Sequence, residues 1–174
     1  MADFLIFQES FKGDIITPDD PNYKAAIARW ASNAERRAKI VAFVKDAEDV
    51  SAAVIFAKAS KLPLAIRGGG HSTSGASSSQ DGIVIDLSKH LNGVRIDPEG
   101  KLAYAGGGAI WSAVDKAAIE YGLASVGGTV NHVKFFLTVC DLLIFYPLRY
   151  TDGRWRVCPI PKLTGPSADL IYAD

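Results

Sequence analysis

A chain of 174 residues is long enough for one domain with a proper core, and 48% hydrophobic and 22% charged residues are ordinary for a folded globular protein. Nineteen basic residues balance nineteen acidic ones, so the composition does not favour a nucleic-acid ligand or an anionic membrane. The two cysteines, Cys140 and Cys158, are too few and too widely spaced for a disulfide framework or a Cys-x-x-Cys pair.

The N-terminal segment has neither a basic region nor a long apolar core, so we expect no signal peptide and a cytoplasmic location. The first predicted element follows Pro18 and Pro21, which are typical of a helix start. An amphipathic helix is predicted from Tyr23 to Trp30, with Ile27 and Trp30 facing inward.

Residues 40–66 have the pattern of a β-α-β unit. The apolar residues 40–44 predict a strand, and Asp46 begins a helix in which Val50, Val54 and Ala57 recur at helical spacing. Residues 62–66 predict a second strand. Such units favour parallel strands and a right-handed crossover.

The sequence Arg67-Gly68-Gly69-Gly70-His71-Ser72 follows this strand directly and is the most informative stretch of the chain. Glycines can adopt positive φ and let a ligand approach the backbone N–H groups. From the residues alone, ligand binding and a purely structural turn remain equally good interpretations. The three histidines are too far apart to suggest a zinc site, and we expect no metal.

Three short strands are predicted next, at 82–87, 94–96 and 102–105, and their turn signals suggest a meander. A helix from Ile110 to Tyr121 follows, with Trp111, Val114, Ala118 and Tyr121 on one face and Gly122 as its stop. The expected fold class is therefore α+β. The apolar run at 135–146 is too short for a membrane span, which needs about 20 residues.

In their order along the chain, these pieces resemble the PCMH-type FAD-binding domain of the vanillyl-alcohol-oxidase and p-cresol-methylhydroxylase superfamily, and in particular its berberine-bridge-enzyme-like oxidases. The resemblance runs from about Tyr23 to Val133. It rests on the strand at 40–44, the helix that follows it, the turn at 67–72, the strand at 82–87, and the glycines at 106–108 and 127–128. It implies FAD as the cofactor and places this chain at the N-terminal part of the domain.

The resemblance implies that the glycine turn wraps the FAD diphosphate and that His71 carries a covalent bond to the flavin. The alternative is a non-covalent site in which His71 only hydrogen-bonds. Val130 stands where some relatives have a second attachment point, a cysteine, so we expect one covalent link at most. The cofactor-binding residues implied are Arg67, Gly68, Gly69, Gly70, His71, Ser72, Gly75, Gly127, Gly128, Thr129 and Val133.

After Val133 the resemblance stops. We therefore expect an N-terminal segment and helix at 1–36, a partial FAD-binding domain at 37–133 and a divergent, irregular tail at 134–174. The implied function is a flavin-dependent oxidation of an alcohol, an amine or a similar small molecule. Because the substrate domain is missing, catalytic residues cannot be assigned. The alternative is a catalytically inactive fragment that binds flavin, or a non-functional truncated gene product.

Overall fold

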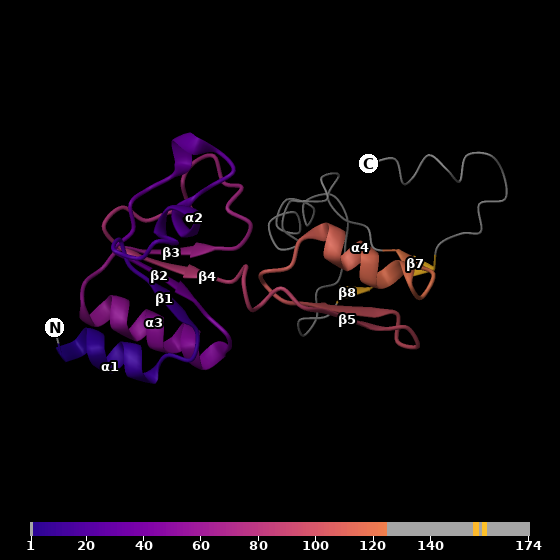
Figure 1. Ribbon diagram of the computed structural model, residues 1–174. Helices are drawn as coiled ribbons and strands as arrows, with labels where there is room; N and C mark the ends of the chain where they lie inside the picture. Colours follow the sequence, from indigo (N-terminus) through magenta and orange to yellow (C-terminus); the bar gives the residue numbers. More distant parts are fainter. Residues whose placement is uncertain (1, 125–154, 157, 160–174) are drawn as a thin grey trace.

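The computed structural model describes residues 2–124, 155–156 and 158–159 (Figure 1). Its helices are α1 (Ala2–Ser10), α2 (Tyr23–Ile27), the 3-10 helix η1 (Ser32–Ala34), α3 (Ala47–Ala59) and α4 (Trp111–Ile119). Its strands are β1 (Asp14–Ile16), β2 (Ile40–Phe43), β3 (Leu64–Arg67), β4 (Ile83–Asp86), β5 (Val94–Asp97), β6 (Leu102–Ala105), β7 (Leu123–Ala124), β8 (Trp155–Arg156) and β9 (Cys158–Pro159). The predicted α+β class is confirmed.

The first sheet has the strand order β1-β2-β4-β3. Strands β2 and β3 are both parallel to β4, with Ile40 and Leu64 each opposite Ile83. The predicted parallel arrangement is correct, but β2 and β3 are not neighbours, because β4 lies between them. The prediction that 82–87 begins a meander is therefore wrong. That strand is the centre of the parallel sheet.

The alternating side chains of β2 and β4 form two apolar faces of this sheet. Ile40, Ala42, Ile83 and Ile85 pack toward α1 and α3, whereas Val41 and Val84 pack toward α2. Figure 1 shows α1 and α3 on one side of the sheet and α2 on the other. A strand buried on both faces is expected to be apolar at every position, as β4 is up to Asp86.

A second sheet is built from the antiparallel pair β5 and β6, and β8 pairs with β6. Helix α4 packs on it through Trp111, Val114 and Ala118. Strands β7 and β9 form a short antiparallel pair beside it. The described part of the predicted irregular tail thus consists of two very short strands, and the rest of 134–174 lies outside the described residues.

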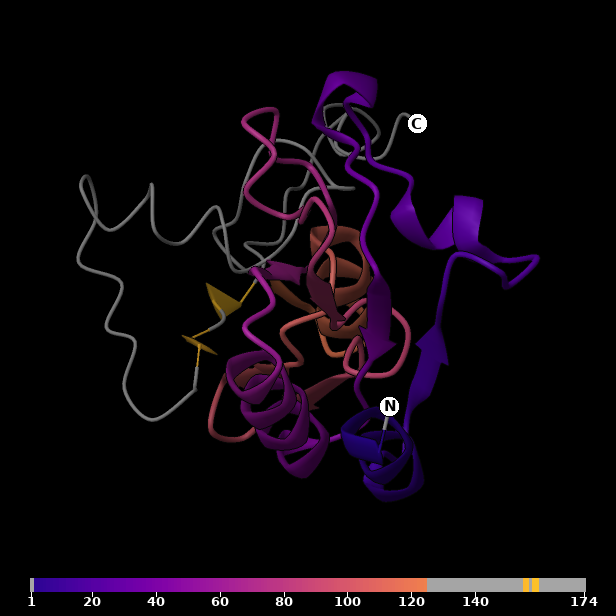
Figure 2. The same ribbon diagram turned by 90° about the vertical axis from the view of Figure 1, so that its left-hand side faces the viewer.

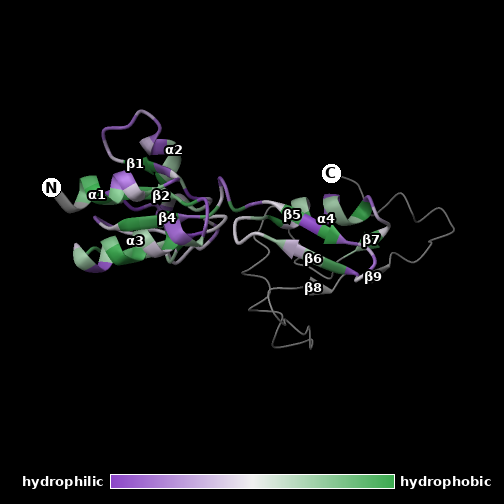
Figure 3. Ribbon diagram, turned by 90° about the horizontal axis from the view of Figure 1, so that it is seen from below, coloured by the Kyte–Doolittle hydropathy of each residue, from purple (hydrophilic) through white to green (hydrophobic). Residues whose placement is uncertain are grey.

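Helix α1 and strand β1 were not predicted. Phe7 of α1 stacks on Phe56 of α3, with their ring centroids 4.5 Å apart, and Phe11 lies 5.1 Å from Phe7. Figure 2 shows α1 and α3 side by side, and hydropathy colouring shows hydrophobic residues along both helices (Figure 3). The N-terminal segment therefore contributes aromatic rings to the main core. No helix among the described residues has the length and apolarity to cross a bilayer.

The structure differs from the predicted helix faces at three positions. Trp30 is 66% exposed and lies beyond α2, which ends at Ile27 because Ala28 is extended at φ −57° and ψ 143°. Tyr121 is 53% exposed, since α4 ends at Ile119 and Gly122 takes the φ of +65° predicted for a stop. Val54 is also exposed, because α3 instead buries Ala53, Phe56 and Ala57.

A charged cluster ties β1 to the chain that leaves β4. The Asp14 carboxylate accepts a hydrogen bond from Lys89 Nζ at 2.9 Å and lies 2.6 Å from His90 Nε2. The bond from Lys89, and secondly that from His90, holds the pKa of Asp14 below its ordinary value of 3.8. A carboxylate whose pKa is lower in the folded state stabilises the fold above its unfolded pKa. That contribution is lost as the pH falls through the folded pKa.

We therefore expect Asp14→Asn to be less stable than the wild type at neutral pH, by an amount that shrinks as the pH falls below about 4. Urea unfolding at a series of pH values measures the difference. Asp19→Asn is the control, because Asp19 is exposed and has no hydrogen bond to any described residue. A stability difference for Asp14→Asn that stays constant down to pH about 3 would contradict the role of this cluster.

Candidate functional site

The glycine turn begins where β3 ends. Arg67 is the last residue of the strand, and the chain leaves the sheet through Gly68, Gly69 and Gly70. Gly70 has φ +71° and Gly75 has φ +83°, both in the left-handed region that favours glycine. The turn thus lies at the carboxyl end of parallel strands, which is where open parallel sheets bind ligands.

Two residues of the chain after α2 hold this turn. The Trp30 N–H donates to the Gly70 carbonyl at 3.2 Å. The Arg29 guanidinium donates to the Ser77 carbonyl, with Nη2 at 2.8 Å, and to the Ile27 and Ala28 carbonyls, with Nη1 at 2.9 Å from each. Arg29 therefore caps the end of α2 and fixes the loop after the turn at the same time.

A buried ion pair lies beneath the turn. Arg67 Nη1 is 2.9 Å from Asp86 Oδ2 and 2.9 Å from the Ala26 carbonyl, and Asp86 is fully buried. Burial, with a further contribution from the Arg67 cation, lowers the pKa of Arg29 to about 10. Arg29 is still protonated at neutral pH. Two guanidinium groups and one carboxylate therefore leave one positive charge in excess under the glycine turn.

The backbone of the turn lies close to these cations because Gly70 lacks a side chain. A Cβ at Gly70 would lie 3.1 Å from Arg29 Cδ and 3.2 Å from Arg67 Nε. Such contacts are tighter than ordinary van der Waals packing. Glycine is needed here for both its φ and its close approach to the two arginines.

Hydrogen-bond donors at the turn are left without partners. Arg67 Nε and the hydroxyls of Ser77 and Ser78 are buried and have no hydrogen-bond partner in the described part of the chain. The N–H groups of Gly68, Gly69 and Gly70 have no acceptor among the described residues either. Buried donors normally find an acceptor. Because these unpaired groups can all donate and the local charge is positive, the turn fits a bound anion such as a diphosphate.

His71 follows the glycines and is half-buried. Its ring centroid lies 6.1 Å from that of Trp30, and the two ring planes are tilted by 36°. Ser72 lies next in the chain, and its hydroxyl accepts from the Ala76 N–H at 3.3 Å. His71 and Ser72 therefore belong to the same turn as the three glycines.

The structure brings together seven of the predicted cofactor-binding residues, namely Arg67, Gly68, Gly69, Gly70, His71, Ser72 and Gly75. The other four, Gly127, Gly128, Thr129 and Val133, lie outside the described residues, as does Val130. Sequence reasoning missed Arg29 and Asp86. Asp86 could have been noticed as a carboxylate that ends an otherwise apolar strand, whereas nothing near Arg29 in the sequence singles it out.

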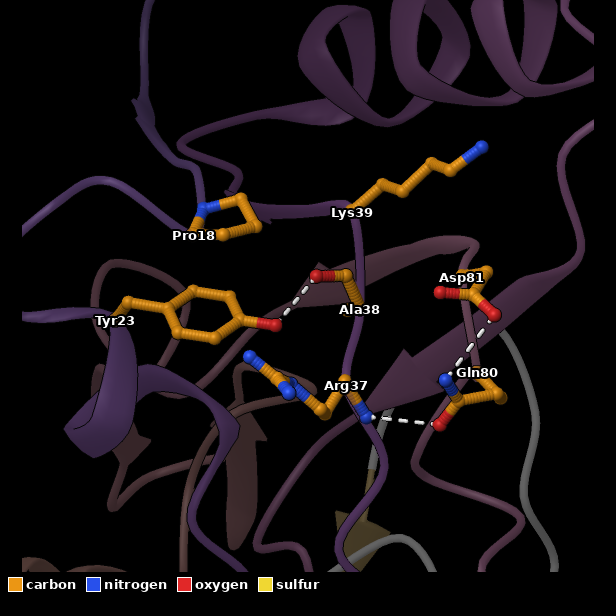
Figure 4. Close-up of a pocket in the computed structure, with 7 residues that line it drawn as sticks. All are labelled: Pro18, Tyr23, Arg37, Ala38, Lys39, Gln80 and Asp81. Atoms are coloured by element: carbon orange, nitrogen blue, oxygen red, sulfur yellow. Dashed lines mark hydrogen bonds between the residues drawn. The ribbon is translucent and has the colours of Figure 1, made fainter.

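Two pockets border the first sheet at its opposite ends. One, of about 390 Å³, lies at the carboxyl end beside Arg67, Ser88 and Lys89. The other, of about 280 Å³, lies before the first residues of β2 and β4 (Figure 4). There the Tyr23 hydroxyl donates to the Ala38 carbonyl at 2.6 Å. Only the first pocket adjoins the residue that begins the glycine turn.

Comparison with known proteins identifies the family. Residues 38–132 match the family model of the FAD binding domain, which is more than half of the chain. The chain belongs to the FAD binding domain family. FAD is the cofactor of this family, and the fold is its PCMH-type domain, of which the chain is an N-terminal part. The described part of this FAD-binding chain has no metal site formed by three or more His, Cys, Asp or Glu side chains.

The relatives of this FAD-binding chain are FAD-linked oxidoreductases. It is 35% identical over 135 residues to (R)-6-hydroxynicotine oxidase of Paenarthrobacter nicotinovorans. The matched segment covers 78% of this chain and 29% of the relative. The chain is also 35% identical over 121 residues to the FAD-linked oxidoreductase YgaK of Bacillus subtilis, covering 70% and 27%. The chain therefore spans less than a third of the length of these relatives.

Solved structures agree with this assignment. The crystal structure of 6-hydroxy-D-nicotine oxidase from Arthrobacter nicotinovorans superimposes with a TM-score of 0.70 at 35% identity, covering 72% of this chain and 28% of the other. The berberine-bridge-enzyme-like protein 1 of Physcomitrella patens has a TM-score of 0.69 at 20% identity, covering 76% and 29%. The second similarity shows that the fold is shared.

Proposed function

We propose that the glycine turn at 67–72 binds the diphosphate of FAD and that the protein takes part in the oxidation of a small organic molecule, such as an alcohol or an amine. The observation that carries the proposal is the set of unpaired buried donors above an excess positive charge. Gly75, Gly127, Gly128, Thr129 and Val133 complete the proposed cofactor site.

Each group of the turn has a distinct role in this proposal. The N–H groups from Gly68 to Ser72 donate to diphosphate oxygens, while Arg29 and Arg67 supply positive charge beneath them. Asp86 keeps Arg67 in place and offsets part of the repulsion between the two cations. The FAD supplies the redox chemistry when it is bound, and these residues hold and orient it.

His71 is the proposed point of covalent attachment to the flavin. Its position directly after the glycines would place the imidazole at one end of the bound diphosphate. Diphosphate binding and covalent attachment thus depend on different groups of one turn. The prediction of a single covalent link, based on Val130, remains part of the proposal, as do the cytoplasmic location and the three segments 1–36, 37–133 and 134–174.

Replacing His71 by alanine is expected to make the flavin fully releasable without preventing its binding, because the backbone donors stay in place. The wild type should keep its yellow colour in the pellet after acid precipitation, and His71→Ala should lose it to the supernatant. His90→Ala is the matched control, since His90 contacts Asp14 and lies outside the turn. Complete release of flavin from the wild type would rule out the covalent role and leave only the diphosphate site.

A second candidate function is flavin binding without turnover. It is favoured by the family match, which covers an FAD binding domain at residues 38–132 and by itself implies cofactor binding. The two candidates are separated by mixing flavin-loaded protein with alcohols and amines without oxygen and following the flavin absorption. Bleaching well above the rate of free FAD supports the oxidase. Stable yellow protein that no substrate bleaches supports the binding fragment.

A further inference from the structure

Trp30 presents an exposed aromatic ring beside the glycine turn. Two-thirds of its surface is accessible, at 66%, although its neighbours Ala26 and Ile27 are buried. The ring lies 6.1 Å from His71, centroid to centroid. Isolated exposed aromatics are common on protein surfaces, so exposure by itself would carry no conclusion. What distinguishes Trp30 is the way its backbone is held.

The backbone at this ring, and the residue before it, are held by contacts to the loop that follows β3. The Trp30 N–H donates to Gly70, and Arg29, the preceding residue, donates to Ser77 at 2.8 Å. Side chains with few rotatable bonds on a fixed backbone lose little entropy when a ligand packs against them. The ring is therefore a preorganised apolar surface at the edge of the turn.

Cations, glycines and aromatic rings are neighbours at this site. Arg29 and Arg67 lie beneath Gly70, and Trp30 and His71 are the residues next to Arg29 and Gly70 in the chain. FAD has matching groups: its anionic diphosphate would face the cations, and its flat, apolar flavin ring system would face the aromatic rings. Aromatic side chains stabilise such rings by offset or edge-to-face packing.

We propose that Trp30, together with His71, forms an aromatic wall against which the flavin ring system of FAD packs. This inference rests on the proposed function and assigns a binding role to a residue outside the glycine turn. Trp30 contacts the flavin end of the cofactor, whereas the turn holds the diphosphate. The two contributions to affinity should therefore respond to different ligands.

The test measures binding constants for FAD and for ADP in the His71→Ala background, where attachment is reversible by design. ADP contains the diphosphate and the adenine but no flavin. Trp30→Ala should weaken FAD binding about tenfold, while ADP binding is unchanged. Trp30→Phe, which keeps an aromatic ring, should retain most of the FAD affinity. Tyr121→Ala is the control, because Tyr121 is similarly exposed, at 53%, but follows α4 of the second sheet.

Fluorescence provides a second measurement, in which an unquenched Trp30 would exclude contact with the flavin. The emission of Trp30 is obtained as the difference between protein with Trp30 and the Trp30→Phe variant, so that the other tryptophans cancel. FAD should quench this emission strongly, because flavin absorbs light at wavelengths where tryptophan emits, and ADP should leave it unchanged.

Four results would overturn the inference. If Trp30→Ala binds FAD as tightly as its parent, or if FAD leaves the Trp30 emission unchanged, the ring does not contact the flavin, while the proposed function stands. If Trp30→Ala weakens ADP and FAD equally, Trp30 acts on the turn or the adenine. If neither the wild type nor the His71→Ala protein takes up FAD at all, the proposed function itself fails, and this inference fails with it.

Discussion

Replacing Asp86 by alanine is expected to lower the free energy of unfolding by about 3–5 kcal/mol. Asp86 is fully buried, and the variant would leave Arg67 without its counter-charge at a site where Arg29 is also positive. The two hydrogen bonds that Asp86 accepts from Ser88, at 2.8 Å and 2.6 Å, would be lost as well. Urea unfolding measures the change.

Asp97→Ala is the matched control for this experiment. Asp97 also ends a strand, β5, but among the described residues its side chain accepts a hydrogen bond only from Gly100 in an exposed turn, so its loss should cost about 1 kcal/mol or less. Equal effects of the two substitutions would show that Arg67 moves to solvent when Asp86 is absent. Removing Arg67 together with Asp86 should recover part of the loss, because no unpaired buried cation then remains.

The second large effect is expected for Gly70→Ala. A residue with a Cβ at φ +71° costs about 1–2 kcal/mol, and the new methyl group would press on Arg29 and Arg67. The methyl group would displace the turn backbone or the two arginines, which are the groups proposed to bind the diphosphate. Flavin retention should therefore fall much more than the free energy of unfolding. Gel filtration of flavin-loaded protein, followed by the absorption of the eluted peak, measures the retention.

Gly93→Ala is the control, since no heavy atom lies within 4 Å of a Cβ built there. It should keep both the stability and the flavin of the wild type. If Gly70→Ala retained its flavin as well as Gly93→Ala does, the close approach of the backbone to the arginines would have no part in cofactor binding.

Local patterns were sufficient for most elements of the sheet and of α3. The apolar runs predicted β2, β3 and β4 to within a few residues, and Asp46 does begin α3, with its carboxylate accepting from the Asp49 N–H at 2.9 Å. The position of β4 between β2 and β3 could not be predicted in the same way. Parallel pairing joins residues far apart in the chain and leaves no periodic signal of its own.

The glycine turn was predicted from the sequence because three glycines after a buried strand are a local signal. The two cations beneath the turn were not predicted, because their contacts are distant in sequence. Arg29 donates to Ser77, 48 residues away, and Arg67 donates to Asp86, 19 residues away. Trp30 was predicted to face inward from its place in an apparent helix. The extended Ala28 and the bond to Gly70 turned it outward, and both depend on tertiary contacts.

The order β1-β2-β4-β3 also has a consequence for the order of folding. The two strands made first after α2, β2 and β3, share no hydrogen bonds and meet only through β4, so the sheet cannot close until residues 83–86 have left the ribosome. The same four residues carry Asp86, which neutralises Arg67. Completion of the sheet and neutralisation of Arg67 therefore depend on the same strand. A nascent chain that ends before residue 83 would have neither.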